Sequence, residues 1–390
     1  MRKVLFLEWE SIGNVFVKKA LEDNGFCVKM FPFDRENEDT RKSPKLAEGI
    51  VKAILEESVE FVFSFNYFPV AAMACKACRK KYISWVYDSP FVQVYSQTIT
   101  FDTNRVFLFD KAVYEDLRAK GVETVRYLPM AAPVAYYDTL IPTEEQRKKY
   151  AADVTMVGSM YTEEKHNLFR HLDKLDQYTK GYLDGIIQAQ KQIYGCNFLE
   201  QMLTPNVMKQ VLKVCPLRVN ADGMETVEWT LANYFLARKV TALERMDIMR
   251  MLQEEYKVQL FTYEKTPQLP SVQNMGVVNN YTVAPIVFKC GKIHLNISLK
   301  SILTGIPLRA FDIMGNGGFL LSNFQNDFLE HFIPDEDFVY YDSYEDLQEK
   351  VRYYVNHDDA RERIARNGYE KVKETHTYEK RIQTILNNID

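Results

Sequence analysis

The stretch that decides the fold is KIHLNISLKSILTGIPLRAFDIMGNGGF, residues 292–319. Its apolar start predicts a buried strand, and Gly305 with Pro307 predicts a turn that leads into a short helix. The glycines near its end predict a second turn before another apolar run. A strand, a helix and a second strand in this order form the repeating unit of a parallel sheet. The stretch therefore predicts an α/β protein.

The same alternation of strands and helices extends through most of the chain. A first series of apolar strands precedes residue 130, and a second series begins at Asp153. The expected strands are Lys3–Leu7, Phe26–Phe31, Phe61–Phe65, Ile83–Tyr87, Arg105–Phe109 and Thr124–Leu128, then Asp153–Val157, Val258–Thr262, Val277–Val278, Ile293–Ile297, Gly318–Ser322 and Phe338–Tyr341. We therefore expect two Rossmann-like parallel-sheet domains that bind a ligand in a shared cleft, at the carboxyl ends of their strands.

Domain boundaries follow from this pattern. The first domain is expected over 1–140 and the second over 150–365, with a polar, proline-containing linker at 132–152. Helical periodicity dominates about 165–255. Because this block is too long for one crossover, we interpret it as a helical insertion in the second domain.

Composition narrows the classes of function. The 390 residues include 49 basic and 53 acidic side chains, a formal charge of -4 that argues against a nucleic-acid-binding protein. No stretch is long and apolar enough for a membrane span or a secretory signal, so we expect a cytoplasmic protein. Six cysteines fit a reducing compartment, and without zinc-like spacing of Cys and His we expect no metal or other cofactor. Peripheral contact with a membrane and the oligomeric state stay open.

Residues 305–317 combine features that favour a bound anion. The free N–H groups near Gly305, where the helix begins, attract negative charge, and Arg309 in the first turn could bind a phosphate through two parallel bonds. Asp312 lies three residues further on the same helix face, where it could accept hydrogen bonds from ribose hydroxyls. Gly317 leaves room for a ligand to approach the backbone. An ion pair between Arg309 and Asp312, with a glycine turn that ends the helix, explains the same residues.

Other residues at the ends of expected strands could also contact such a ligand. Backbone N–H groups could meet a diphosphate, polar side chains could face the cleft, a lysine could offset phosphate charge, and a tyrosine could stack on the base. These candidates are Gly158, Ser159, Asn296, Ser298, Lys300 and Tyr281. An ordinary strand–helix turn, a solvated lysine and a core tyrosine remain the alternatives.

The first domain offers candidates for acid–base catalysis. Asp88 directly follows a buried strand, so its carboxylate could take a proton from a substrate hydroxyl as a general base. Asn66 and Glu10 lie at the corresponding ends of two other strands. A turn-initiating role for Asp88 before Ser89 and Pro90 is equally compatible with the sequence.

Several motifs resemble those of one protein family. Residues 292–325, Tyr340–Leu347, Ile364–Gly368 and His376–Arg381 resemble the C-terminal half of CgeB-like (spore maturation type) glycosyltransferases, which have the GT-B fold. The N-terminal half resembles the domain usually paired with it. Its matching segments are Phe63–Pro69, Trp85–Pro90, Val106–Asp110 and Tyr127–Ala131. Asp153–Ser159 resembles the strand with which the second domain of these enzymes begins.

The resemblance implies a metal-independent glycosyltransferase with two Rossmann-like domains that face a cleft, and a last helix, 366–390, that crosses back to the first domain. The donor would be a nucleoside-diphosphate sugar, most often a UDP-sugar, and the acceptor a hydroxyl of a cell-surface or spore glycan or of a protein. Related enzymes carry two glutamates eight residues apart. Here Asp312 matches the second and Thr304 falls at the first, which departs from the pattern. A nucleotide-sugar epimerase or hydrolase, or a non-catalytic nucleotide- or glycan-binding protein, would fit the same fold.

Overall fold

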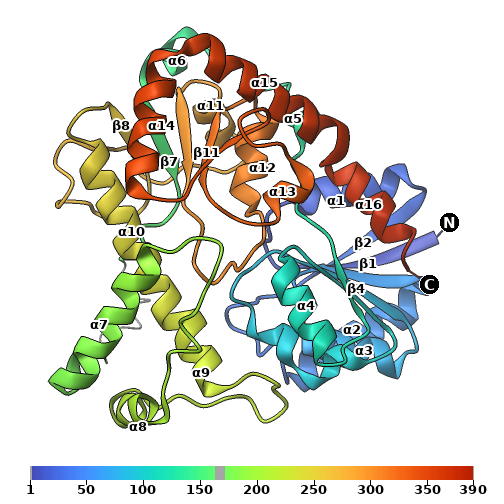
Figure 1. Cartoon of the computed structure of the whole chain (residues 1–390). Coiled ribbons are helices and arrows are strands. Elements are labelled where there is room, and N and C mark those ends of the chain that lie inside the picture. The colour runs from blue at the N-terminus through green and yellow to red at the C-terminus, as the bar shows by residue number, and fades with distance from the viewer. Residues whose placement is uncertain (1, 163–171, 390) are drawn as a thin grey trace. The chain divides into compact units, whose positions relative to one another are not determined.

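The computed structural model describes residues 2–162 and 172–389. The chain forms two compact units (Figure 1). Unit 1 comprises Met1–Ala131, Val219–Glu225 and His376–Asp390, and unit 2 comprises Ala132–Arg218 and Thr226–Thr375. The short segment Val219–Glu225 thus belongs to unit 1, although the chain on both sides of it belongs to unit 2.

Unit 1 is built on a six-stranded parallel sheet of order β2-β1-β3-β4-β5-β6. Its strands are β1 (Arg2–Glu8), β2 (Phe26–Pro32), β3 (Phe61–Phe65), β4 (Lys81–Val86), β5 (Asn104–Leu108) and β6 (Val125–Tyr127). Its helices are α1 (Asn14–Asp23), α2 (Pro44–Glu57), α3 (Pro69–Ala77), α4 (Lys111–Ala119) and α16 (Tyr378–Leu386). Every residue of β3 is buried, as expected for a parallel strand with helices on both faces.

Unit 2 contains a second parallel sheet, of order β12-β11-β10-β7-β8-β9. Its strands are β7 (Val154–Val157), β8 (Val258–Phe261), β9 (Gln273–Asn274), β10 (Ile293–Asn296), β11 (Leu320–Asn323) and β12 (Val339–Tyr341). The helices outside the insertion are α5 (Val134–Tyr137), α6 (Glu144–Tyr150), α11 (Ala284–Phe288), α12 (Leu308–Gly315), α13 (Phe328–His331), α14 (Tyr344–Asn356) and α15 (Asp358–Thr375). The expected α/β class with two Rossmann-like sheets is confirmed.

A helical insertion separates β7 from β8. It contains α7 (Gln177–Lys191), α8 (Pro205–Val214), α9 (Val227–Thr230), a π-helical turn (Leu231–Leu236) and α10 (Ala237–Leu252). Apolar side chains such as Leu183, Val211 and Leu236 form a core of their own here, and Figure 1 shows α7 alongside α10. The expected helical block is confirmed over its described part, while residues 163–171 lie outside the described residues.

Two local predictions are wrong. The edge strand of unit 2 is β9 at Gln273–Asn274, not Val277–Val278, because Gly276 turns the chain at φ 75° and leaves Val277 75% exposed. The stretch expected as a linker, 132–152, contains α5 and α6. Thr143 begins α6 through a reciprocal capping box with Gln146, a local signal that its polar composition obscured.

Candidate functional site

Asp88 lies just beyond β4 and is held by the residue that follows β3. Asn66 donates from Nδ2 to Asp88 Oδ2 at 2.8 Å, and its Oδ1 accepts from the N–H groups of Tyr87 and Asp88 at 3.1 and 3.3 Å. The two strands are paired, with Phe65 opposite Trp85, so the residues that follow them lie side by side. The structure therefore brings together two of the predicted catalytic candidates. Asn66 is fully buried, whereas the side chain of Asp88 is 33% exposed.

Arg35 is a third member of this group, and no pattern in the sequence indicates it. Its Nη2 donates to Asp88 Oδ2 at 2.9 Å, and its guanidinium lies 4.2 Å from the centroid of the Trp9 ring. Trp9 stacks on Tyr87 and donates from Nε1 to the carbonyl of Phe65 at 2.8 Å. The cation–π contact and these hydrogen bonds hold the loops after β1, β2 and β4 against one another.

A cavity of about 1270 Å³ opens beside this group, at the carboxyl ends of β1 and β2. Its walls come from Glu8–Glu10 and Pro32–Glu38, so Arg35 belongs both to the cavity and to the pair with Asp88. Glu10 lies in the wall with an exposed side chain and a φ of 63°. The cavity is large enough for a sugar-sized ligand.

In unit 2, three N–H groups of the turn after β7 already have partners. Gly158 donates to the backbone of β8 at 3.1 Å, Met160 donates to Glu264 Oε1 at 2.8 Å, and Tyr161 donates to Ser159 Oγ at 2.9 Å. Ser159 in turn donates from its hydroxyl to Glu264 Oε1 at 2.5 Å. A diphosphate at this turn would have to compete for these donors.

Glu264 and Arg245 organise the same turn, and both were missed from the sequence. Burial alone would raise the pKa of Glu264, but hydrogen bonds from Ser159 and Thr262 outweigh it and hold the pKa below its ordinary value. The guanidinium of Arg245 donates to the carbonyls of Ser159 and Ile297, at the carboxyl ends of β7 and β10. A buried cation therefore joins the ends of two neighbouring strands.

Arg309 and Asp312 form the ion pair that their spacing suggests. Arg309 Nη1 lies 3.2 Å from Asp312 Oδ2, and its Nη2 donates to Asn280 Oδ1 at 3.0 Å. The other carboxylate oxygen of Asp312 accepts from Tyr137 OH at 2.8 Å. Burial raises the pKa of Asp312, and Arg309 and Tyr137 act against this rise. A ribose contact at Asp312 would therefore have to displace one of these partners.

Polar side chains at the ends of β10 and β11 are bonded to one another. Asn296 donates from Nδ2 to Ser298 Oγ at 3.2 Å and to Ser322 Oγ at 2.8 Å. The N–H of Ser298 donates to Asn323 Oδ1 at 2.7 Å. The structure brings Asn296 and Ser298 together at this strand end, as the sequence suggested.

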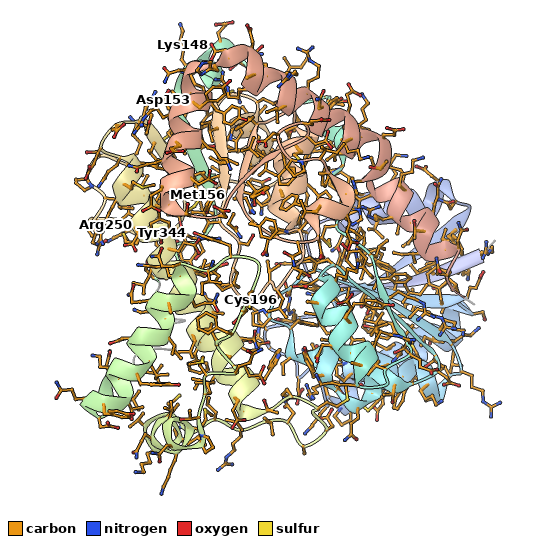
Figure 2. The ribbon with its side chains drawn as sticks, in the orientation of Figure 1. Lys148, Asp153, Met156, Cys196, Arg250 and Tyr344 are labelled. Atoms are coloured by element: carbon orange, nitrogen blue, oxygen red, sulfur yellow. The ribbon has the colours of Figure 1, made fainter. Side chains whose placement is uncertain are left out.

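Lys300 faces a buried carboxylate instead of open space. Its Nζ lies 3.4 Å from Glu244 Oε2, and Tyr194 OH donates to Glu244 Oε1 at 2.7 Å. Lys300 and Cys196, which is labelled in Figure 2, line a cavity of only about 10 Å³. That volume holds roughly one water molecule, so the ammonium group is committed to Glu244.

The remaining candidates for contact with a bound nucleotide lie in turns. Gly305 is buried and accepts from Gln325 Nε2 at 3.4 Å. Gly317 follows α12 at φ 73°, a left-handed conformation that suits glycine and ends the helix. Tyr281 is half-buried and its N–H donates to Asn279 Oδ1 at 2.8 Å.

Within the described residues, no cluster of three His, Cys, Asp or Glu side chains has the arrangement of a metal site. In the same residues, no helix combines the length and apolar character needed to cross a membrane.

Comparison with known proteins gives one family match and a set of structures with a similar fold. Residues 247–387 match a family described as glycosyl transferase-like. No curated protein sequence matches the chain. Three solved structures align with nearly all of it. They are a glycosyltransferase from Rickettsia africae (TM-score 0.56, 11% identity, 100% of this chain and 97% of that one), HepE from Anabaena in complex with UDP and glucose (0.53, 11%, 100% and 99%), and a sucrose-phosphate synthase from Thermosynechococcus elongatus (0.57, 12%, 98% and 97%). At these identities the likeness establishes the shared two-domain fold.

Proposed function

We propose that this protein is a glycosyltransferase that moves a sugar from a nucleoside-diphosphate sugar to an acceptor hydroxyl, and that its donor is a UDP-sugar. Three observations support the proposal: the shared fold, the family match over 247–387, and the structure of HepE with UDP and glucose. The finer assignments are also proposals. They are a CgeB-like enzyme, a spore or cell-surface glycan or a protein as acceptor, a mechanism without a metal, and a cytoplasmic setting in which all six cysteines stay free.

The observation that carries the proposal is the state of Asp88. Two donors, Asn66 Nδ2 and Arg35 Nη2, contact its Oδ2, and no described residue donates to its Oδ1. Its side chain is one-third exposed at the carboxyl end of a parallel strand. A general base needs an available oxygen, and the absence of a described donor on Asp88 Oδ1 supports this role.

The proposed reaction needs one proton acceptor and one stabilised leaving group. Asp88 Oδ1 takes the proton of the acceptor hydroxyl as its oxygen forms a bond to the anomeric carbon of the donor sugar. The bond from that carbon to the phosphate oxygen breaks, and the nucleoside diphosphate leaves with the bonding electrons. Arg309 and the N–H groups at the start of α12 are the proposed stabilisers of its negative charge.

An acceptor panel with radiolabelled UDP-sugars tests the function. Asp88→Asn should lower transfer by about 100- to 10,000-fold, the usual contribution of a general base. Asp102→Asn is a matched control, because this carboxylate pairs with Lys76 on the surface of unit 1 and its side chain is 80% exposed. Epimer or free sugar formed at full rate without acceptor would instead identify an epimerase or hydrolase. UDP binding without turnover would identify a binding protein.

A further inference from the structure

Asn66 has a backbone conformation that few residues adopt. Its φ is 58°, in the left-handed region where Asn is among the tolerated residues. Its N–H donates to the carbonyl of Trp85 at 2.9 Å, and its own carbonyl accepts from Ser64 Oγ at 2.6 Å. Ser64 Oγ is also 2.7 Å from Tyr82 OH. The backbone of Asn66 is therefore fixed from inside the sheet by buried groups.

This fixed backbone aims the amide group at the loop after β4. The two ends of the amide act differently, because Oδ1 accepts from two consecutive N–H groups, of Tyr87 and Asp88, and Nδ2 donates to the Asp88 carboxylate. Asn66 is 0% exposed, so it cannot itself meet a substrate without rearrangement. Its contacts can influence the reaction only through Asp88.

The bonds to Asp88 are unevenly shared between the two carboxylate oxygens. Asn66 and Arg35 both donate to Oδ2, at 2.8 and 2.9 Å, and no described residue donates to Oδ1. An Asp carboxylate otherwise rotates easily about its last torsion, which is broad. Two donors on one oxygen restrict that rotation and leave the other oxygen available.

We propose that Asn66 is a positioning residue, which holds the Asp88 loop through its carbonyl oxygen and presents Asp88 Oδ1 to the acceptor hydroxyl through its amide nitrogen. This inference rests on the proposed role of Asp88 as general base. It reassigns Asn66 from direct catalysis to control of the base, and it explains why an amide occupies this position instead of a carboxylate or an apolar side chain.

Two substitutions separate the roles of the amide oxygen and the amide nitrogen. Asn66→Gly keeps the left-handed backbone accessible and removes both ends of the amide. Asn66→Asp also tolerates that backbone, keeps an acceptor for the two N–H groups, and replaces the donor to Asp88 with a second carboxylate. Ser58→Gly is a matched control, because Ser58 is also left-handed, at φ 51°, but exposed at the end of α2.

Hydrogen exchange of backbone N–H groups tests the role of Asn66 Oδ1, and steady-state kinetics test the role of Asn66 Nδ2. In peptides that contain Tyr87 and Asp88, amide exchange should be faster in Asn66→Gly than in wild type and unchanged in Asn66→Asp. Both variants should lose about 100-fold in kcat with little change in KM for the donor, since a misplaced base impairs the chemical step. Ser58→Gly should match wild type in both measurements.

Three results would overturn the inference: full kcat in Asn66→Gly, full kcat in Asn66→Asp, or unchanged exchange in Asn66→Gly. The exchange measurement needs no substrate. If wild type transfers no sugar, the proposed function fails, and the exchange pattern still decides whether Asn66 fixes the Asp88 loop.

Discussion

Removal of one hydroxyl, in Tyr137→Phe, should destabilise unit 2 in a pH-dependent way. Tyr137 OH donates to Asp312 Oδ1 at 2.8 Å, and the side chain of Asp312 is only 11% exposed. Without this donor, one carboxylate oxygen is left in the protein interior without a partner. A hydrogen bond to a charged group contributes about 1.5–3 kcal/mol. At roughly 2–4 °C per kcal/mol for a unit of this size, the expected fall in Tm is about 3–12 °C.

The sign of the pH dependence follows from the pKa of Asp312. Burial raises this pKa, and the Tyr137 hydrogen bond is one of two contacts that lower it. The substitution should therefore raise the pKa of Asp312 further. A carboxyl group whose pKa is higher in the folded state favours folding below its unfolded pKa, and this contribution is lost as the pH rises through the folded pKa. The deficit of the variant should consequently be largest at neutral pH and shrink in acid.

Calorimetric unfolding at neutral pH and in acid measures this difference, because protonation of Asp312 removes the charge that the hydrogen bond from Tyr137 stabilises. Tyr178→Phe is the control, since Tyr178 also lies in unit 2 and is 77% exposed. An equal fall in Tm at both pH values, or none at neutral pH, would refute the reasoning. Either result would mean that Tyr137 does not stabilise an ionised Asp312.

Three further predictions concern carboxylates and a buried histidine. Asp312→Ala should weaken UDP binding in calorimetry, because the substitution releases the guanidinium of Arg309, which Asp312 holds at 3.2 Å. Asp88→Ala should bind UDP like wild type. If Asp312→Ala binds UDP as tightly as wild type, the proposed donor site is wrong. Burial lowers the pKa of His294 to about 3, so the stability that the neutral imidazole contributes above about pH 6.5 should be lost as the pH falls. In His294→Gln, the free energy of unfolding measured in urea should depend less on pH over this range. Burial would raise the pKa of Asp222, but hydrogen bonds from Arg41 and Ser96 outweigh burial and lower this pKa. Asp222→Asn should therefore cost unit 1 about 1–3 kcal/mol at neutral pH and little in strong acid, where residue 222 is uncharged in both variant and wild type. Equal thermal unfolding of variant and wild type at neutral pH would contradict this.

The fold was predictable from the sequence because strands buried in a parallel sheet are short, continuous apolar runs. Phe61–Phe65 is buried at every position and was predicted at its observed bounds. The prediction failed at Val277–Val278, where Val277 is 75% exposed and Val278 is half-buried. These two valines follow the turn at Gly276 instead of filling the core of the sheet, so their apolar character does not indicate a strand.

The candidate site was predictable only in part. Strand ends place residues such as Asn66 and Asp88 at one edge of a sheet, so their proximity follows from the strand pattern. The partners that set their chemistry come from distant parts of the chain: Arg35 is 53 residues from Asp88, and Tyr137 is 175 residues from Asp312. Such contacts depend on how loops pack, and no local period in the sequence encodes them.

The two aspartates that carried the functional prediction differ in what their surroundings allow. Both oxygens of Asp312 have partners within unit 2, and its side chain is 11% exposed, so its contribution to donor binding can run only through the orientation of Arg309. Asp88 is 33% exposed, and both of its side-chain partners contact a single oxygen. A carboxylate acts as a base only through an oxygen that is free to accept a proton. These surroundings support the proposed acid–base role of Asp88, whereas Asp312 holds the Arg309 cation in place.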